Sequence, residues 1–373
     1  MGIGESEVIV VSSLLRSVVY PAMSRAGLLS RHARTGDVSV LTYHGVLPHG
    51  AVMRLSPTDG TLLSADQFTE ELRFLKSRYQ LISPEDFHSW LKDRASLPTG
   101  AVLLTCDDGL RNVLTDMVPI LEAEGARCLF FITGASLQEN PESLWYEELY
   151  RMLDDAPGDV PLIVNGKARR RDELAGKNLV KCWWGLVQEL SAVNVEDREE
   201  GLRLLRAKWQ LPADWRITEE MHAARRYHLL NRQELQQLVT RGMTVGAHTL
   251  SHPFLAKMSP DLAELEICEC KARLELFLKQ EVWALAYPFG DEGSAGAREL
   301  KMAEGAGYAC AFLNYGGGLL RRTNPRFALP RANVTAGMNI AEFEAHMSGF
   351  HDLLQKSVRG DGDGLQRPHR NGV

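Results

Sequence analysis

The chain has 373 residues, of which 45% are hydrophobic and 24% are charged, and both values are ordinary for a soluble globular protein. The net charge of −6, without interleaved basic and aromatic residues, does not indicate a nucleic-acid surface, so we expect no nucleic-acid partner. The six cysteines are scattered through a long chain, which favours a reducing compartment over a disulfide framework.

Residues 1–36 are predicted to form a helical lead-in. Their apolar stretch, Val8–Tyr20, is too short to span a bilayer, and Glu5 and Glu7 stand where a signal peptide carries positive charge. The opening MGIGES matches a myristoylation pattern, which is short and frequent. We therefore expect a cytoplasmic protein whose N-terminal helix packs on the domain, with peripheral contact at the inner membrane face as the alternative.

Short apolar runs alternate with helical patterns in the next part of the chain, and Ser64 and Ser83 are placed to cap two of the helices. The expected elements are a strand at Val38–Tyr43, a helix at Ser64–Ser77, a strand at Tyr79–Ile82, a helix opening at Ser83, a strand over Val102–Leu104, a helix at Leu110–Glu124 and a strand at Cys128–Ile132.

Residues 134–230 interrupt this alternation with tryptophans and long charged stretches, which predicts a mostly helical insertion. Asn165–Gly166 is a candidate hairpin turn within it. Alternation then resumes. The expected elements are a helix capped by Asn231, a strand at Met243–Ala247, a helix at Ser259–Phe277, a strand at Trp283–Tyr287, a helix at 295–305, a strand at Tyr308–Phe312, an extended segment at Phe327–Arg331 and a helix at 339–356.

This pattern predicts one parallel α/β domain over residues 37–356, followed by a disordered tail at 357–373. Ligands of parallel α/β folds bind at the carboxyl ends of the strands. One such end carries Asp107 and Asp108 before Gly109. Taken alone, Asp-Asp-Gly is also ordinary turn chemistry.

A second strand end carries His248 and His252, and Pro253 directly after them favours a loop over a helix. Two imidazoles and a carboxylate from a neighbouring loop suit a divalent ion such as zinc, although histidines in turns also act as hydrogen-bonding caps. Cys268 and Cys270 resemble a metal pair, but residues i and i+2 of a helix do not share a face.

Three motifs together resemble the polysaccharide deacetylase (NodB-homology) family of metal-dependent carbohydrate esterases. Thr105–Gly109, TCDDG, resembles its first motif, and His248–His252, HTLSH, resembles its second. Tyr287–Gly290, YPFG, resembles the third. The segments Leu41–Gly45 and Leu329–Arg331 are similar to the branch that includes exopolysaccharide and cell-surface glycan deacetylases.

The resemblance implies a distorted (β/α) barrel with the helical insertion. It implies that Asp107 is a general base, and that Asp108, His248 and His252 bind Zn²⁺ or another divalent ion such as Co²⁺ or Ni²⁺. The implied reaction is removal of N-acetyl groups from hexosamine units of a glycan or glycolipid by a metal-bound water, in cell-surface glycan biosynthesis.

The chain departs from the family pattern at several positions. Cys106 replaces the usual Phe, as a packing change. Tyr287 stands where the family has an arginine that pairs with the catalytic aspartate, and Arg331 is the candidate to supply that charge. The late Leu-x-His motif with the general acid is absent, so His44 becomes the candidate acid or substrate contact. Asp291 is a turn residue or a further site residue.

Tyr287, Pro288 and Gly290 are expected to form a substrate-binding wall. Other functions also fit the same residues. An O-acetyl esterase or an amidohydrolase of non-sugar C–N bonds would use the same chemistry, and a non-catalytic glycan-binding barrel would not use it at all.

Overall fold

The computed structural model describes residues 13–48, 57–139, 141, 143–164, 167–174, 176–212, 215–217, 226–291 and 293–359. The MGIGES pattern and the candidate turn at Asn165–Gly166 lie outside these residues, as does the expected tail from residue 360 onward. Among the helices that are described, none is both long and apolar enough to cross a membrane.

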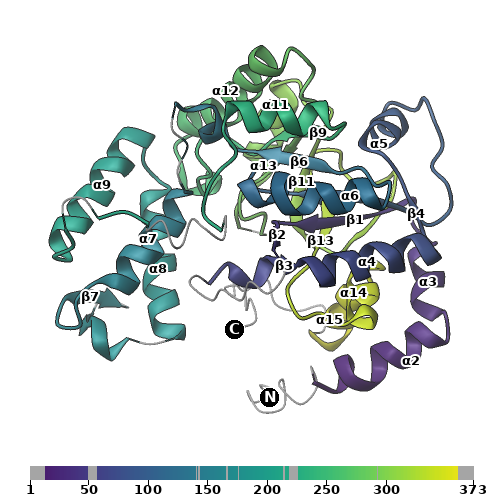
Figure 1. Cartoon of the computed structure of the whole chain (residues 1–373), viewed down its shortest axis with the longest axis horizontal. Coiled ribbons are helices and arrows are strands. Elements are labelled where there is room, and N and C mark those ends of the chain that lie inside the picture. The colour runs from purple at the N-terminus through teal and green to yellow at the C-terminus, as the bar shows by residue number, and fades with distance from the viewer. Residues whose placement is uncertain are drawn as a thin grey trace.

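Parallel strands form a closed barrel at the centre of the molecule (Figure 1). They are β1 (Val38–Tyr43), β5 (Ala101–Cys106), β6 (Leu129–Ile132), β9 (Thr244–Ala247), β10 (Ala284–Ala286), β11 (Cys310–Gly316) and β13 (Leu329–Asn333). Their order is β1-β13-β11-β10-β9-β6-β5, and β5 returns to pair with β1 from Val38↔Ala101 to Tyr43↔Cys106. The predicted distorted (β/α) barrel is confirmed.

Short strands extend this sheet or lie apart from it. β4 (Gln80–Leu81) is parallel to the start of β5, and β12 (Leu319–Leu320) is antiparallel to the start of β1. Two pairs stand alone: β2 (Val46–Leu47) with β3 (Leu63–Ser64) in parallel, and β7 (Pro161–Val164) with β8 (Lys167–Arg170) in antiparallel. The last pair flanks the predicted hairpin turn.

The barrel strands have apolar residues on both faces because each face is covered. β1, β5 and β6 are buried along their whole length. Val40, Leu103, Phe131 and Phe312 pack inside one core cluster, whereas alternate residues such as Leu104 pack in a second cluster with the surrounding helices. Continuous apolar runs are therefore expected for these strands.

Helices surround the barrel, most of them in the connections between its strands, and α14 follows the last strand. They are α4 (Ala65–Arg78), α5 (Pro84–Leu91), α6 (Val118–Ala123), α11 (Arg232–Thr240), α12 (Pro260–Leu278), α13 (Ala297–Gly305) and α14 (Ile340–Met347). Ser64, Ser83 and Asn231 cap α4, α5 and α11 as predicted, the last two through capping boxes.

Two predicted helices differ from the structure. The expected helix over Leu110–Glu124 is a π-helix, η3 (Val113–Met117), followed by α6. The expected helix over 339–356 is divided into α14 and α15 (Phe350–Arg359), because Gly349 between them has a left-handed φ of 72°. Residues 357–359, predicted to belong to the tail, continue α15.

The lead-in and the connecting loops contain short helical turns. Before β1 come η1 (Leu15–Val19), α2 (Tyr20–Arg25) and α3 (Leu28–Ala33). Both α2 and α3 contact α14. The 3-10 turns are η2 (Asp59–Thr61), η4 (Gly134–Leu137), η5 (Arg171–Glu173) and η6 (Leu255–Lys257). Tyr20 and Leu29 of the lead-in form a small core with Ala345 of α14.

Between β6 and β9 the chain leaves the barrel to form the insertion. It contains α7 (Trp145–Asp155), α8 (Lys177–Leu190) and α9 (Val195–Lys208), together with the β7–β8 pair. These helices stand beside the barrel, at the left of Figure 1, and have a core of their own that includes Leu149, Trp183 and Leu202. The insertion is therefore a packed unit and not an extended loop.

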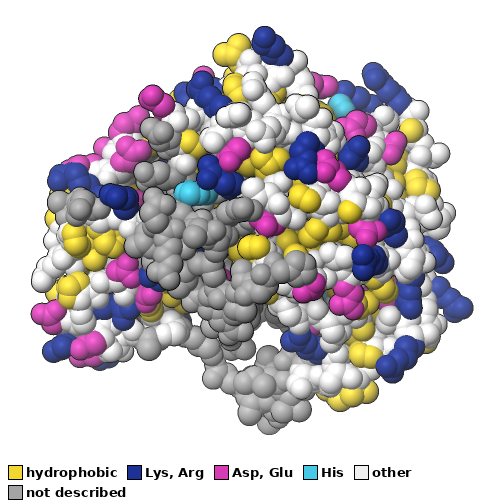
Figure 2. Space-filling model, viewed as in Figure 1, with side chains coloured by type: hydrophobic (Ala, Val, Ile, Leu, Met, Phe, Trp, Pro, Cys, Tyr) yellow, Lys and Arg dark blue, Asp and Glu magenta, His cyan; other side chains and the backbone are white. Residues whose placement is uncertain are grey.

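Acidic and basic side chains are interspersed over the face of the molecule shown in Figure 2. Several pair across neighbouring helices: Arg73 and Lys76 of α4 bind Glu124, and Arg241 binds Glu122 of α6. Such exposed pairs contribute about 0–1 kcal/mol each, so the barrel core and not this surface dominates stability.

Gly246 of β9 provides a test of the barrel packing. A Cβ there would lie 2.6 Å from the Phe131 ring and 3.1 Å from the Ala284 carbonyl oxygen, so Gly246→Ala should cost about 1–3 kcal/mol of unfolding free energy. Gly185 of α8 has nothing within 4 Å, and Gly185→Ala should be neutral or stabilising by up to about 1 kcal/mol. Equal melting temperatures for the two variants would contradict this packing.

Candidate metal centre and active site

The expected catalytic and metal-binding residues come from four separate strands of the barrel. Asp107 and Asp108 follow β5, and the loop with His248 and His252 follows β9 without forming a helix, as predicted. Arg331 lies on β13 and His44 follows β1. Because all these strands are parallel, their carboxyl ends lie at one end of the barrel, where the insertion also stands.

Asp108, His248 and His252 converge on one point. The Asp108 Oδ1 atom lies 3.4 Å from His248 Nε2 and 3.3 Å from His252 Nε2, and the candidate ligand atoms all lie within 4.8 Å of one another. No other group of this kind occurs in the part of the chain that the structure describes. The carbonyl oxygen of Ala286 lies 2.8 Å from His248 Nδ1, which leaves Nε2 of that ring for a metal.

The three side chains fit a divalent ion. All are buried, and one carboxylate with two imidazoles is a donor set that zinc-class ions accept. Burial opposes ionisation of Asp108, but hydrogen bonds to both histidines outweigh it and hold its pKa well below the usual range. Burial lowers the pKa of His252, which favours the neutral imidazole that binds metals.

His248 behaves differently from His252. Burial acts to lower its pKa, but the hydrogen bond to Asp108 outweighs burial and raises the pKa above its ordinary value. A proton on His248 competes with a metal for the same nitrogen, so metal affinity at this centre is expected to fall as the pH falls.

Left-handed backbone conformations shape both ligand loops. Asp108 has a φ of 75°, and Thr249 and His252 have φ of 62° and 56°, values that non-glycine residues rarely adopt. The Asp107 N–H donates to the Tyr43 carbonyl at 2.9 Å and so continues the strand pairing up to the turn. The turn at Asp108 then directs the two neighbouring carboxylates to different partners.

Asp107 forms a bidentate ion pair with Arg331. Arg331 Nη1 donates to Oδ1 and Nη2 to Oδ2, both at 2.7 Å, and the guanidinium is fully buried. Its Nε donates to the Leu313 carbonyl and its Nη1 also donates to Thr105 Oγ1. Burial opposes ionisation of Asp107, but Arg331 outweighs it, so the pKa of Asp107 lies below its ordinary value.

The candidate His44 lies within the field of the same charged groups. Burial lowers its pKa, although Asp108 and Asp107 act in the opposite direction. Its Nδ1 is buried and has no hydrogen-bond partner within the described ranges. A neutral His44 is suited to a hydrogen bond with a substrate more than to donating a proton.

The predicted substrate wall of Tyr287, Pro288 and Gly290 needs correction at Tyr287. That side chain belongs to the barrel core, and its hydroxyl donates to the Phe327 carbonyl at 3.1 Å. Gly290 has a φ of 62°, and a Cβ there would lie 2.6 Å from the Asn314 backbone nitrogen. The turn instead presents Phe289, whose ring centroid lies 4.7 Å from that of His252.

Two aromatic residues near the candidate metal ligands were not predicted from the sequence. Tyr146 of α7 packs against His252, with the ring centroids 4.8 Å apart, and Trp184 of α8 packs against Phe289 at 5.3 Å. Phe289 lies inside the recognised third motif, but no local pattern singles out Tyr146 among the aromatic residues of the insertion. The insertion therefore supplies part of the wall beside the candidate metal ligands.

The cysteines lie apart from this chemistry. Cys106 is fully buried, and burial raises its pKa well above the usual value, as suits a packing residue and not a nucleophile. Cys268 and Cys270 are not among the grouped metal-ligating residues that the structure describes.

The Asp291 oxygens accept hydrogen bonds from Gly293 and Ser294, which is a turn role.

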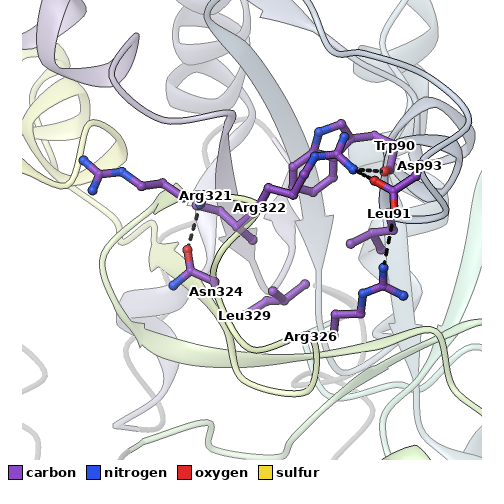
Figure 3. Close-up of a pocket in the computed structure, with 9 residues that line it drawn as sticks. Trp90, Leu91, Asp93, Arg321, Arg322, Asn324, Arg326 and Leu329 are labelled. Atoms are coloured by element: carbon purple, nitrogen blue, oxygen red, sulfur yellow. Dashed lines mark hydrogen bonds and ion pairs between the residues drawn. The ribbon is translucent and has the colours of Figure 1, made fainter.

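A different pocket lies near the start of β1, remote from the metal ligands (Figure 3). It is lined by Trp90, Leu91, Asp93, Leu320, Arg321, Arg322, Asn324, Arg326 and Leu329. Arg322 and Arg326 both point toward Asp93, so two of its cations are already paired.

A family model described as polysaccharide deacetylase matches residues 200–311, which include His248, His252 and the turn after β10. Over these residues the chain is similar to the polysaccharide deacetylase family. It is 25% identical over 123 residues to "Putative polysaccharide deacetylase YxkH" of Bacillus subtilis (strain 168). That match covers 33% of this chain and 43% of YxkH, so the chain spans less than half of that relative's length.

Several solved structures share the fold of this chain. The Streptococcus pyogenes deacetylase PplD, in complex with acetate, superposes with a TM-score of 0.51 at 18% identity, over 83% of this chain and 97% of PplD. IcaB from Ammonifex degensii gives 0.51 at 15% identity, over 84% and 97% of the two chains. The de-N-acetylase of Aggregatibacter actinomycetemcomitans gives 0.52 at 13% identity, over 83% and 99%.

The Asp107–Arg331 pair predicts a pH effect. In Arg331→Met, burial acts on Asp107 without the opposing cation, so its pKa should rise, and the acid limb of the kcat/KM profile should move up by about 1–3 pH units. Arg331→Lys keeps a charge and should shift the limb less. An acid limb unmoved in the folded Met variant would show that Asp107 does not set it.

Proposed function

We propose that the chain is a metal-dependent hydrolase that removes N-acetyl groups from hexosamine units of a glycan or glycolipid. The observation that carries the proposal is the buried Asp108–His248–His252 group beside the ionised Asp107, at the carboxyl end of the barrel. Deacetylases of the family are metal-dependent, which supports this use of the three ligands.

Asp108, His248 and His252 would hold the ion, and zinc is our first choice because its common ligands are imidazole and carboxylate. When bound, a divalent ion of this class supplies Lewis-acid polarisation of the acyl carbonyl and lowers the pKa of water. Cobalt or nickel would fit the same donor set.

Asp107 is the base in this proposal. It takes the proton of the attacking water as the new C–O bond forms, and the proton then passes to the amine nitrogen as the C–N bond breaks. Acetate and a free amine are the products. Arg331 keeps Asp107 ionised and holds both of its oxygens, so only the lone pairs outside that ion pair accept the proton.

A hydrogen bond from His44 to the substrate completes the assignment. Its buried, unpaired Nδ1 and its position between the charged groups favour a polar contact with the acetamide or sugar. Pro288 and Gly290 shape the turn that presents Phe289, and we assign the wall contact to that ring instead of to Tyr287.

The substrate class is supported by what the structural relatives are called. One is a de-N-acetylase and another is a deacetylase in complex with acetate. We propose an acetylated cell-surface glycan or its lipid-linked precursor, acted on in the cytoplasm at the inner membrane face. Cell fractionation tests the location, and recovery of the protein outside the cell would contradict it.

Substituting Asp107 and Asp108 one at a time tests whether one is the base and the other a metal ligand. Asp107→Asn should retain the metal and lose about 10²–10⁴-fold in kcat, because the base is absent while the ligands remain. Asp108→Ala and His248→Ala should lose metal and turnover together. Metal content by elemental analysis and acetate release from N-acetylated oligosaccharides measure both effects.

The same assay separates the other candidate functions. Release of acetate from O-acetylated sugars alone would indicate an esterase, and hydrolysis of non-sugar amides alone would indicate an amidohydrolase. A folded protein that takes up no zinc, cobalt or nickel would instead fit a non-catalytic glycan-binding barrel and contradict the proposal.

A further inference from the structure

The insertion contacts the loop of the second motif through named polar bonds. Trp145 Nε1 of α7 donates to the backbone carbonyl of His252 at 3.2 Å. Arg198 Nη2 of α9 donates to the hydroxyl of Ser251, directly before His252, at 2.5 Å. The Tyr146 ring packs on the His252 ring. Two helices of the insertion thus hold adjacent residues of one short loop.

These contacts form a connected group and not isolated surface bonds. The Arg198 guanidinium stacks over Trp145, 4.8 Å from the ring centroid, and Arg198 is only 2% exposed. Ser251 also bonds to α12 on its other side. Its N–H donates to Glu266 at 2.9 Å, and its hydroxyl donates to the same carboxylate. The loop is clamped between the insertion and α12.

His252 needs this support more than His248 does. The Ala286 carbonyl fixes the Nδ1 side of His248 from inside the barrel, whereas the buried Nδ1 of His252 has no partner among the described residues. The backbone of His252 is also left-handed, at a φ of 56°. Its N–H donates to Thr249 Oγ1 within the loop, and Phe289 packs on one side of its ring. The remaining contacts, at the carbonyl and at another side of the ring, come from α7.

We propose that Trp145 and Arg198 are positioning residues for the metal ligand His252, so that the helical insertion is a working part of the metal centre. The proposal rests on the proposed function in one respect, that His252 binds a metal. Neither residue touches the ion or the substrate in this account; they act by holding the loop that presents the imidazole.

Trp145→Phe tests the proposal, because it removes the N–H donor and keeps an aromatic ring. Trp215→Phe is a matched control: Trp215 also belongs to the insertion, donates its Nε1 at 3.2 Å to Asp155, and lies under Arg206 at 5.9 Å. Zinc affinity of the full chain, measured by competition with a chelator, should fall about 10-fold in Trp145→Phe and stay within about 2-fold in Trp215→Phe.

A spectroscopic readout separates positioning from general destabilisation. The visible absorption of the cobalt-loaded protein reports ligand arrangement, and it should change in Trp145→Phe and in Arg198→Met but not in Trp215→Phe. If Trp145→Phe does not fold, Arg198→Met carries the test alone, with the same expected loss of zinc affinity.

His252→Ala separates a failure of the positioning proposal from a failure of the metal site itself. If it loses the metal while Trp145→Phe and Arg198→Met bind zinc like wild type, the positioning proposal is overturned and the metal site stands. If His252→Ala keeps full zinc affinity, His252 is not a ligand, and both the proposed function and the positioning proposal are overturned.

Discussion

Six consecutive residue pairs between β1 and β5 close the barrel, and the site depends on that closure. β1 pairs with β13 on its other side, so the closed sheet brings Arg331 of β13 and Asp107 after β5 to the same rim. An open sheet would leave these strands at opposite edges. The Tyr43 carbonyl, which accepts the Asp107 N–H, extends the same pairing into the site.

The charges at this rim are stable only as a set. A fully buried guanidinium is costly to desolvate, and Arg331 meets that cost with two bonds to Asp107 and further bonds to Leu313 and Thr105. The two adjacent carboxylates face different partners. Asp107 is paired with a buried guanidinium, whereas Asp108 faces two imidazoles, whose nitrogens would lose any bound proton to solvent when a metal binds.

The chain differs from the family pattern in which strands supply two features of the site. Where the third motif usually supplies an arginine, Tyr287 turns into the core, and a different strand delivers the cation to Asp107. The aromatic wall is divided in a similar way between Phe289 of that turn and Tyr146 of the insertion. The site needs a cation beside Asp107 and aromatic rings beside His252. Different strands or helices can supply them.

The sequence by itself determined the features that are encoded locally. Strand runs, the caps Ser64, Ser83 and Asn231, and the loop at His248–Pro253 follow from residues within a few positions of one another. The barrel and the three candidate metal ligands were predicted from the resemblance of three motifs to a known family. Local rules failed at the π-helix η3 and at the break before α15.

Only the tertiary structure decided contacts between distant segments. Arg331 and Asp107 are 224 positions apart, and the bond from Trp145 to His252 spans 107. The sequence could nominate Arg331 only through a family resemblance, and it gave no reason to choose Trp145 or Tyr146 among many aromatic residues. The physical reason is that these pairs form only after the barrel closes and the insertion packs, so no periodicity along the chain records them.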